Sequence, residues 1–188
     1  VDGHVVRNPT VAEMERRRSA TVLLSDRMAM TGFKEAYPGT TIVGGLLSHP
    51  HGWLGRVGRR MDGVVGGMAT FAKSGTAGFT IAGPNLEVRA VTCPVREYGD
   101  ETPDAIVLQN LQSLREDLGE AVRVFAGIMI SCVARPEFYD QTDVECGLFA
   151  KVFPGVPLSG FFAGGELGSE EFRITGYSTV FMVLGERT

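Results

Sequence analysis

The chain has 188 residues, of which 44% are hydrophobic and 21% charged, and its formal net charge is −4. This balance is typical of an ordinary domain with one core, or of two small halves that share one core, and it excludes the strongly basic surface of a nucleic-acid-binding protein. No apolar run approaches the ~20 residues of a membrane-spanning helix, and the first residues lack the apolar segment of a signal peptide.

The N-terminal half predicts mainly strands after an irregular or helical lead-in over residues 1–18. Apolar runs and one alternating run, LEVRAVTC, predict strands over residues 20–25, 40–47, 64–71, 77–82 and 86–93. A short helix is expected over residues 26–37, ending at Pro38-Gly39. The polar loop before the third strand carries the only tryptophan, Trp53.

The C-terminal half predicts two helices between longer strands. Apolar residues at helical spacing indicate a helix over 104–118, with Asp104 as its cap and Gly119 at its end. A second helix is expected over 142–153, where Thr142 and Glu145 have the spacing of a capping box. The strands expected here cover residues 125–133, buried on both faces, and 156–162 and 174–184.

An internal repeat links the two halves. The spacing Phe-x3-Tyr-Pro-Gly-x2-Ile-x-Gly over residues 33–44 returns as Phe-x3-Phe-Pro-Gly-x2-Leu-x-Gly over residues 149–160. Each copy precedes a glycine-rich turn, which favours duplication of a strand–helix–strand–strand unit. We therefore expect an α+β fold with a mixed, largely antiparallel sheet and packed helices, in which residues 19–95 and 96–188 form two related halves of one domain.

The glycine-rich stretch VPLSGFFAGGELG, residues 156–168, does not fit a nucleotide-binding loop. A P-loop needs Lys and Ser or Thr after its last glycine, whereas Glu166 lies here and would repel phosphate. A structural role fits better, because Gly164 and Gly165 allow a tight turn or a positive φ. Glu166 is the residue that this explanation covers least: it either caps backbone amides or faces a ligand amine or a cation of a partner.

The three cysteines do not suggest a disulfide framework or a metal centre. Their odd number and unpaired spacing favour a reducing compartment, and no third ligand stands near His49 and His51. Cys132 ends an apolar strand three residues before Arg135, which would activate its thiol. We favour the interpretation that Cys132 is buried and inert over a role as a nucleophile, since its histidine partner would have to be His49 or His51 from the other half.

The run ISCVARPEFY…VECGLFAKVFPGVPLSGFFAGGELG…YSTVFMVLG resembles the C-terminal FIST domain, which occurs in bacterial sensory proteins and in eukaryotic F-box proteins. The similarity covers residues 124–185 and is looser over residues 19–95. The similarity is greatest to the F-box-and-FIST proteins of eukaryotes. This chain departs from them in two ways: it contains no F-box, and it has Cys-Val-Ala-Arg-Pro where the family has Cys-Val-Gly-Arg-Gly. The first residue is Val rather than Met, so we expect a processed or trimmed piece of a longer protein.

The resemblance implies a non-catalytic binding module for a protein partner or a small, amino-acid-like ligand, derived from a ubiquitin-ligase substrate receptor. An alternative is a structural accessory subunit of a large multi-protein assembly. In either case we expect an intracellular, reducing compartment: the cytoplasm or nucleus, or an organelle interior if the N-terminus is processed. No cofactor, metal, nucleic acid or membrane span is expected. The residues that we expect to bind a ligand or partner are Cys132, Arg135, Gly164, Gly165, Glu166 and Trp53.

Overall fold

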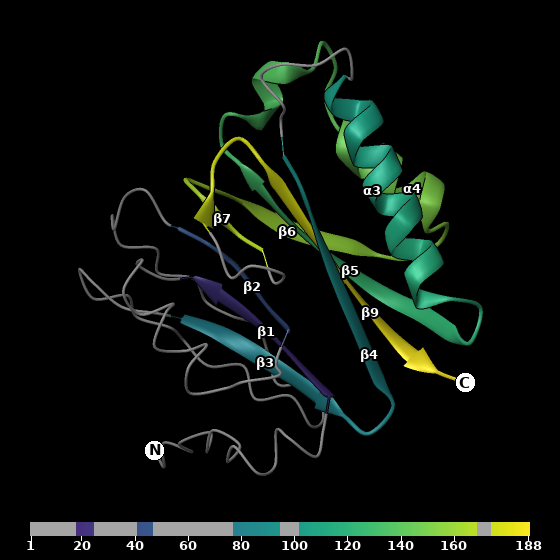
Figure 1. Cartoon of the computed structure of the whole chain (residues 1–188). Helices are drawn as coiled ribbons and strands as arrows, with labels where there is room; N and C mark the ends of the chain where they lie inside the picture. Colours follow the sequence, from purple (N-terminus) through teal and green to yellow (C-terminus); the bar gives the residue numbers. More distant parts are fainter. Residues whose placement is uncertain (1–17, 25–40, 47–76, 95–101, 169–173) are drawn as a thin grey trace.

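A computed structural model describes residues 18–24, 41–46, 77–94, 102–168 and 174–188 (Figure 1). The predicted helix over 26–37, the predicted strand over 64–71, most of the lead-in, and the loop with His49, His51 and Trp53 lie outside these residues. Within them, no helix is long and apolar enough to cross a membrane.

Two sheets and two α-helices make up the described part of the chain. The five-stranded sheet has the order β3-β1-β2-β7-β8, with strands Ala77–Gly83, Arg18–Leu24, Thr41–Gly45, Glu166–Leu167 and Ile174–Thr175. The four-stranded sheet has the order β4-β9-β5-β6, with strands Leu86–Cys93, Thr179–Arg187, Val122–Cys132 and Leu158–Ala163. Among the described strands, only the pairs β1–β2 and β5–β6 are parallel, so the expected α+β fold with largely antiparallel sheets is confirmed.

The same three-strand arrangement occurs in both sheets. In the first, β1 pairs in parallel with β2 and antiparallel with β3; in the second, β5 pairs in parallel with β6 and antiparallel with β9. This agrees with two related halves. The sheets also exchange strands, because β7 from the C-terminal half pairs with β2, and β4 from the N-terminal half pairs with β9.

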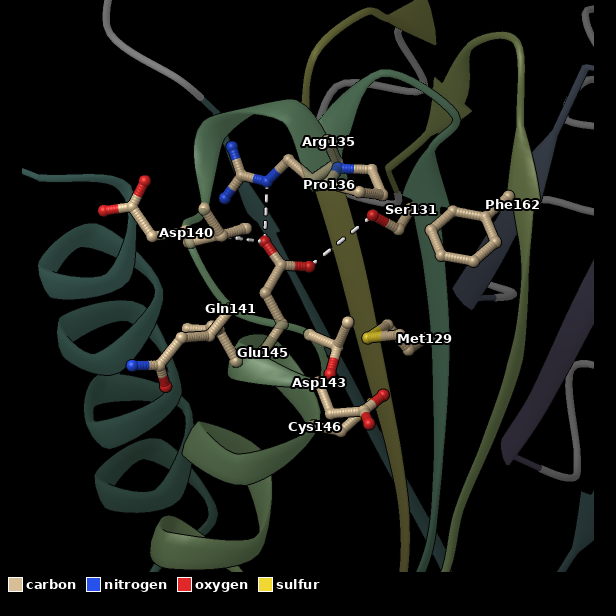
Figure 2. A pocket seen from close by; sticks show the side chains of 13 residues that line it. Met129, Ser131, Arg135, Pro136, Asp140, Gln141, Asp143, Glu145, Cys146 and Phe162 are labelled. Atoms are coloured by element: carbon tan, nitrogen blue, oxygen red, sulfur yellow. Dashed lines mark hydrogen bonds and ion pairs between the residues drawn. The ribbon is translucent and has the colours of Figure 1, made fainter.

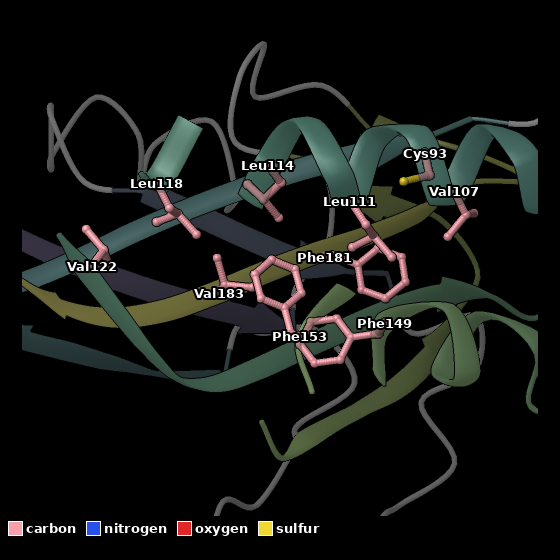
Figure 3. Packing of buried hydrophobic residues seen from close by; sticks show 10 residues of the cluster. All are labelled: Cys93, Val107, Leu111, Leu114, Leu118, Val122, Phe149, Phe153, Phe181 and Val183. Atoms are coloured by element: carbon pink, nitrogen blue, oxygen red, sulfur yellow. The ribbon is translucent and has the colours of Figure 1, made fainter. Parts of the chain in front are cut away.

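The four-stranded sheet is the middle layer, with the helices α3 (Pro103–Leu118) and α4 (Val144–Val152) on one face (Figure 1). Alternate residues of β9 face opposite layers: Phe181 and Val183 pack under the helices, while Val180, Met182 and Leu184 belong to the core that also contains Val43 of β2. Figure 3 shows α3 placing its apolar stripe over Phe181, beside Phe149 and Phe153. The 3.6-residue period of α3 and the continuous apolar run of β9 thus form one layered core.

Several expected boundaries were wrong for local reasons. Helix α3 begins at Pro103 with Thr102 at the N-cap position, so Asp104 lies in the first turn and is not the cap. The strand expected over 174–184 is interrupted at residues 176–178, where Tyr177 has φ 54°. The strand expected over 125–133 begins at Val122 and is not buried throughout: its register shifts between Val124 and Ala126, and Phe125, in that bulge, is 44% exposed.

The capping box expected for α4 was also wrong. The N-cap residue is Asp143, which is in the left-handed region at φ 59° and forms no side-chain cap hydrogen bond. An N-cap residue normally has an extended backbone, so a reciprocal capping box does not form here. Glu145 instead points into the protein, where it is 6% exposed.

Candidate functional site

Glu145 is the centre of a buried polar network where β5 and β6 end and β9 begins. Its Oε1 accepts a hydrogen bond from Arg135 Nε and one from the Tyr139 hydroxyl, both at 2.6 Å. Its Oε2 accepts one from Thr179 Oγ1 at 2.7 Å. Three short hydrogen bonds, one of them from a cationic donor, offset the free energy of removing this carboxylate from water.

Arg135 is the matching cation and is 1% exposed. It lies in a short 3₁₀ helix, η1 (Arg135–Phe138), directly after the turn that follows β5. Its Nη1 donates to the carbonyl of Tyr177 at 3.1 Å, and its guanidinium carbon lies 5.7 Å from the centre of the Tyr139 ring. The remaining Nη2 is buried and has no hydrogen-bond partner among the described residues. The arginine thus ties η1 both to α4 and to the turn before β9.

The phenol and thiol groups around this ion pair are kept protonated. Burial, followed by the hydrogen bond to Glu145 and its negative charge, raises the pKa of Tyr139, which therefore remains a hydrogen-bond donor. Burial and then the charge of Glu145 raise the pKa of Cys93 to about 12. Both groups therefore keep their protons at neutral pH.

A pocket of about 360 Å³ lies above this network (Figure 2). Figure 2 shows Glu145 and Ser131 at its floor, with Phe162 and Met129 approaching from β6 and β5. The other wall is the segment from η1 to the start of α4, including Pro136, Asp140, Asp143 and Cys146. The floor is polar and held in place, the sheet side is apolar, and the rim carries exposed carboxylates. This volume and mixed lining are typical of small-ligand sites.

Glu166 neither faces this pocket nor caps an exposed turn, because it is 0% exposed. Its Oε2 accepts hydrogen bonds from the backbone N–H of Ser178 at 3.2 Å and from the Ser178 hydroxyl at 2.8 Å. Burial raises its pKa to about 7, although the bonds from Ser178 and Cys132 and the charge of Arg135 oppose this. Its Oε2 thus caps the backbone N–H of Ser178 inside the core, while its Oε1 is buried and has no hydrogen-bond partner among the described residues.

The structure brings Cys132, Arg135 and Glu166 together around the segment 177–179. Cys132 is 6% exposed, and its backbone N–H donates to the carbonyl of Ser178 at 2.9 Å. Of the expected binding residues that the structure describes, only Arg135 lines the pocket. Trp53 lies outside the described residues.

Gly164 and Gly165 have a structural role at this place in the fold. The two residues join β6 to β7 and exchange backbone hydrogen bonds with Leu46, and neither has a positive φ. Their backbone therefore links the two sheets, and they do not line the pocket.

Sequence reasoning missed Glu145, Tyr139 and Thr179. Glu145 was assigned to a capping box, and no sequence pattern distinguishes Tyr139 and Thr179 from other polar residues. One usable signal existed: in α4, VECGLFAKV, Glu145 lies among apolar residues one turn or more from Lys151, and an acid buried there needs a cationic partner. Among the described residues, no group of three or more His, Cys, Asp or Glu could hold a metal ion.

Comparison with known proteins confirms the resemblance to the C-terminal FIST domain. Residues 98–169 match the family called the FIST C domain. Two curated relatives are F-box only protein 22 of Pongo abelii and F-box only protein 22 of Homo sapiens, each 30% identical over 105 residues. The matched region covers 55% of this chain and 25% of each relative, so the chain matches about a quarter of their length. Arg135, Glu145, Glu166 and all the pocket-lining residues lie within the matched residues.

Proposed function

We propose that this chain is a non-catalytic, FIST-type binding module whose pocket accepts a small ligand or one side chain of a protein partner. The observation that carries the proposal is the pocket of about 360 Å³ on a floor fixed by the Arg135–Glu145 pair. A floor whose rotamers are locked by short, charge-assisted bonds loses little entropy when a ligand binds. The residues that match the FIST C domain include this floor, which supports assigning binding to it.

The absence of catalysis is part of the same proposal. Cys132 and Cys93 are buried, and raised pKa values make thiolates of Cys93 and Cys146 scarce at neutral pH. Tyr139 is held as a donor to Glu145, and Arg135 is occupied by Glu145 and Tyr177. The groups around the pocket are thus committed to structure, which favours binding over proton transfer or nucleophilic attack.

The three free cysteines support an intracellular, reducing compartment as part of this proposal. The relatives' name, F-box only protein 22, supports the further proposal that the module derives from a ubiquitin-ligase substrate receptor. In such a role, the FIST-like part of the protein would contact the partner.

A structural accessory subunit of a larger assembly is the second candidate. The exposed side chains Val133, Phe138, Phe162 and Tyr177, each at least 40% accessible, favour it because they give one end of the domain an apolar surface. Recovery of the native protein only in a fixed-stoichiometry complex, with no free pool and no ligand response, would support this candidate over the first.

Cys146 provides a direct test of the pocket. It lines the pocket and is partly exposed, while the other two cysteines are buried, so iodoacetamide should modify it first. A panel of the amino acids and short peptides is screened by thermal shift, and each hit is tested for slower alkylation by intact-mass spectrometry. The proposal expects at least one compound to raise the melting temperature and protect Cys146. If no compound does either, and affinity purification finds no specific partner, the binding role is wrong.

A further inference from the structure

A second feature of the same end of the domain is an exposed aromatic pair. The rings of Phe138 and Tyr177 meet edge to face with their centres 6.0 Å apart, yet the residues remain 40% and 54% exposed. Val133 is linked to this place through the backbone: it follows Cys132, whose N–H donates to the carbonyl of Ser178, the residue after Tyr177. Val133 is itself 55% exposed. These three residues are called the aromatic surface below.

Tyr177 is held on this surface by unusual means. Its φ of 54° lies in the left-handed region, which tyrosine rarely adopts and glycine adopts readily. Arg135 binds the Tyr177 carbonyl, and Glu166 binds the N–H of the following residue. Strained residues of this kind persist where the surrounding structure fixes them, often at functional positions. Packing does not explain the tyrosine, because more than half of it is exposed.

The charges around the aromatic surface indicate its partner. Residues 131–146 carry four carboxylates and a single cation, Arg135, which is buried and paired with Glu145. Within this segment of the described residues, the exposed charges are all negative, on Glu137, Asp140 and Asp143. This arrangement repels a second copy of the acidic chain and attracts Lys or Arg. Exposed aromatic rings also attract cations and act as anchors in protein interfaces.

We propose that the aromatic surface docks a segment of a protein partner in which an apolar side chain is flanked by lysine or arginine. The apolar side chain packs on Phe138, Tyr177 and Val133, and the basic residues face Glu137, Asp140 and Asp143. The inference rests on the proposed function as a binding module. Its apolar anchor uses Phe138, Tyr177 and Val133, which do not line the pocket, whereas Asp140 and Asp143 border both the pocket and this surface.

The test uses three fluorescent hexapeptides: Lys-Lys-Leu-Phe-Lys-Lys, Glu-Glu-Leu-Phe-Glu-Glu and Lys-Lys-Ser-Ser-Lys-Lys. Anisotropy titration of the full chain should show the first peptide binding at least ten-fold more tightly than the others, with affinity falling as salt rises. Tyr177→Asn should weaken this binding at least ten-fold. Asn tolerates the left-handed backbone, so the variant should melt at the same temperature or higher, which separates lost binding from lost folding.

Phe125→Ala is the matched control, because Phe125 is also exposed but lies on the bulge of β5. It should leave peptide affinity unchanged, as should alkylation of Cys146, which occupies the pocket. Equal binding of all three peptides, no binding at millimolar concentration, or full binding by Tyr177→Asn would each overturn the inference. Self-association of the chain that disappears in Tyr177→Asn would also overturn it, because the surface would then bind a second copy. Loss of peptide binding on alkylation of Cys146 would overturn it as well, because the peptide would then occupy the pocket.

Discussion

Arg135 and Glu166 hold the two ends of one peptide group. Arg135 Nη1 donates to the carbonyl of Tyr177 at 3.1 Å, and the N–H of Ser178 in the same peptide unit donates to Glu166 Oε2 at 3.2 Å. The cation meets the negative end of the peptide dipole and the carboxylate meets the positive end. Two buried side chains of opposite charge thus fix the turn that leads into β9, Arg135 from the 3₁₀ helix η1 and Glu166 from β7.

Glu166 should make stability depend on pH. Its pKa is raised from 4.5 to about 7 in the folded chain, so the folded state keeps a proton that the unfolded state releases. The contribution of this group to the free energy of unfolding is therefore greatest below about pH 4.5. It falls by up to about 3 kcal/mol as the pH rises from there through about 7, and it is constant at higher pH. Chemical denaturation across this range should show that decline, and Glu166→Gln should flatten it. The exposed Glu137→Gln serves as control; an identical slope in wild type and Glu166→Gln would contradict the prediction.

The Arg135–Glu145 pair should show a large cost when one partner is lost. Arg135→Met leaves a buried carboxylate without its cation, and we expect a loss of about 3–5 kcal/mol in urea denaturation. Adding Glu145→Gln removes the orphaned charge and should recover part of this loss. The exposed pair Arg123–Glu186, with atoms 3.1 Å apart, is the comparison, where Arg123→Met should cost about 0–1 kcal/mol. Equal losses at the two pairs would show that burial of the Arg135–Glu145 pair has no energetic consequence.

Cys146 should be a slow but selective thiol. Burial and then the charges of Asp143 and Glu145 raise its pKa, so less thiolate is present at a given pH than in a free cysteine. Asp143→Asn keeps a residue that tolerates the left-handed backbone and removes one of these charges, so alkylation at pH 8 should accelerate. Asp140→Asn, also on the pocket wall, is the control. A rate that responds equally to both substitutions would contradict this electrostatic account.

Gly45 should be required where the two sheets approach each other. A Cβ added there would lie 2.5 Å from Ala163 Cβ, with Phe161 and Ile130 close behind. Gly45→Val should therefore cost about 1–3 kcal/mol in thermal or urea unfolding. Gly147→Ala is the opposite case, because nothing lies within 4 Å of its added Cβ in α4, and it should stabilise the chain by about 0.5–1 kcal/mol. A tolerated Gly45→Val would show that the sheets can separate at this point.

Elements with a strong local period were predictable. The apolar spacing of α3 predicted its buried residues and its end at Gly119, and the alternation of LEVRAVTC predicted β4 with its bounds. The repeated motif predicted two related units, and the structure has a parallel strand pair in each, β1–β2 and β5–β6. In each case the information lies within one stretch of chain, where backbone period and side-chain polarity decide the outcome.

The candidate site depended on contacts that no local pattern records. Glu145 fits a capping box equally well until folding brings Arg135 and Thr179 within hydrogen-bonding distance, and Glu166 fits an exposed turn until Ser178 reaches it. The amino-acid sequence by itself thus determined the fold class, the main helices and strands, and the FIST resemblance, because apolar periodicity is a local property. Only the tertiary structure decided which charges are buried and paired, because that choice rests on the balance between desolvation and partners contributed by residues distant in the chain.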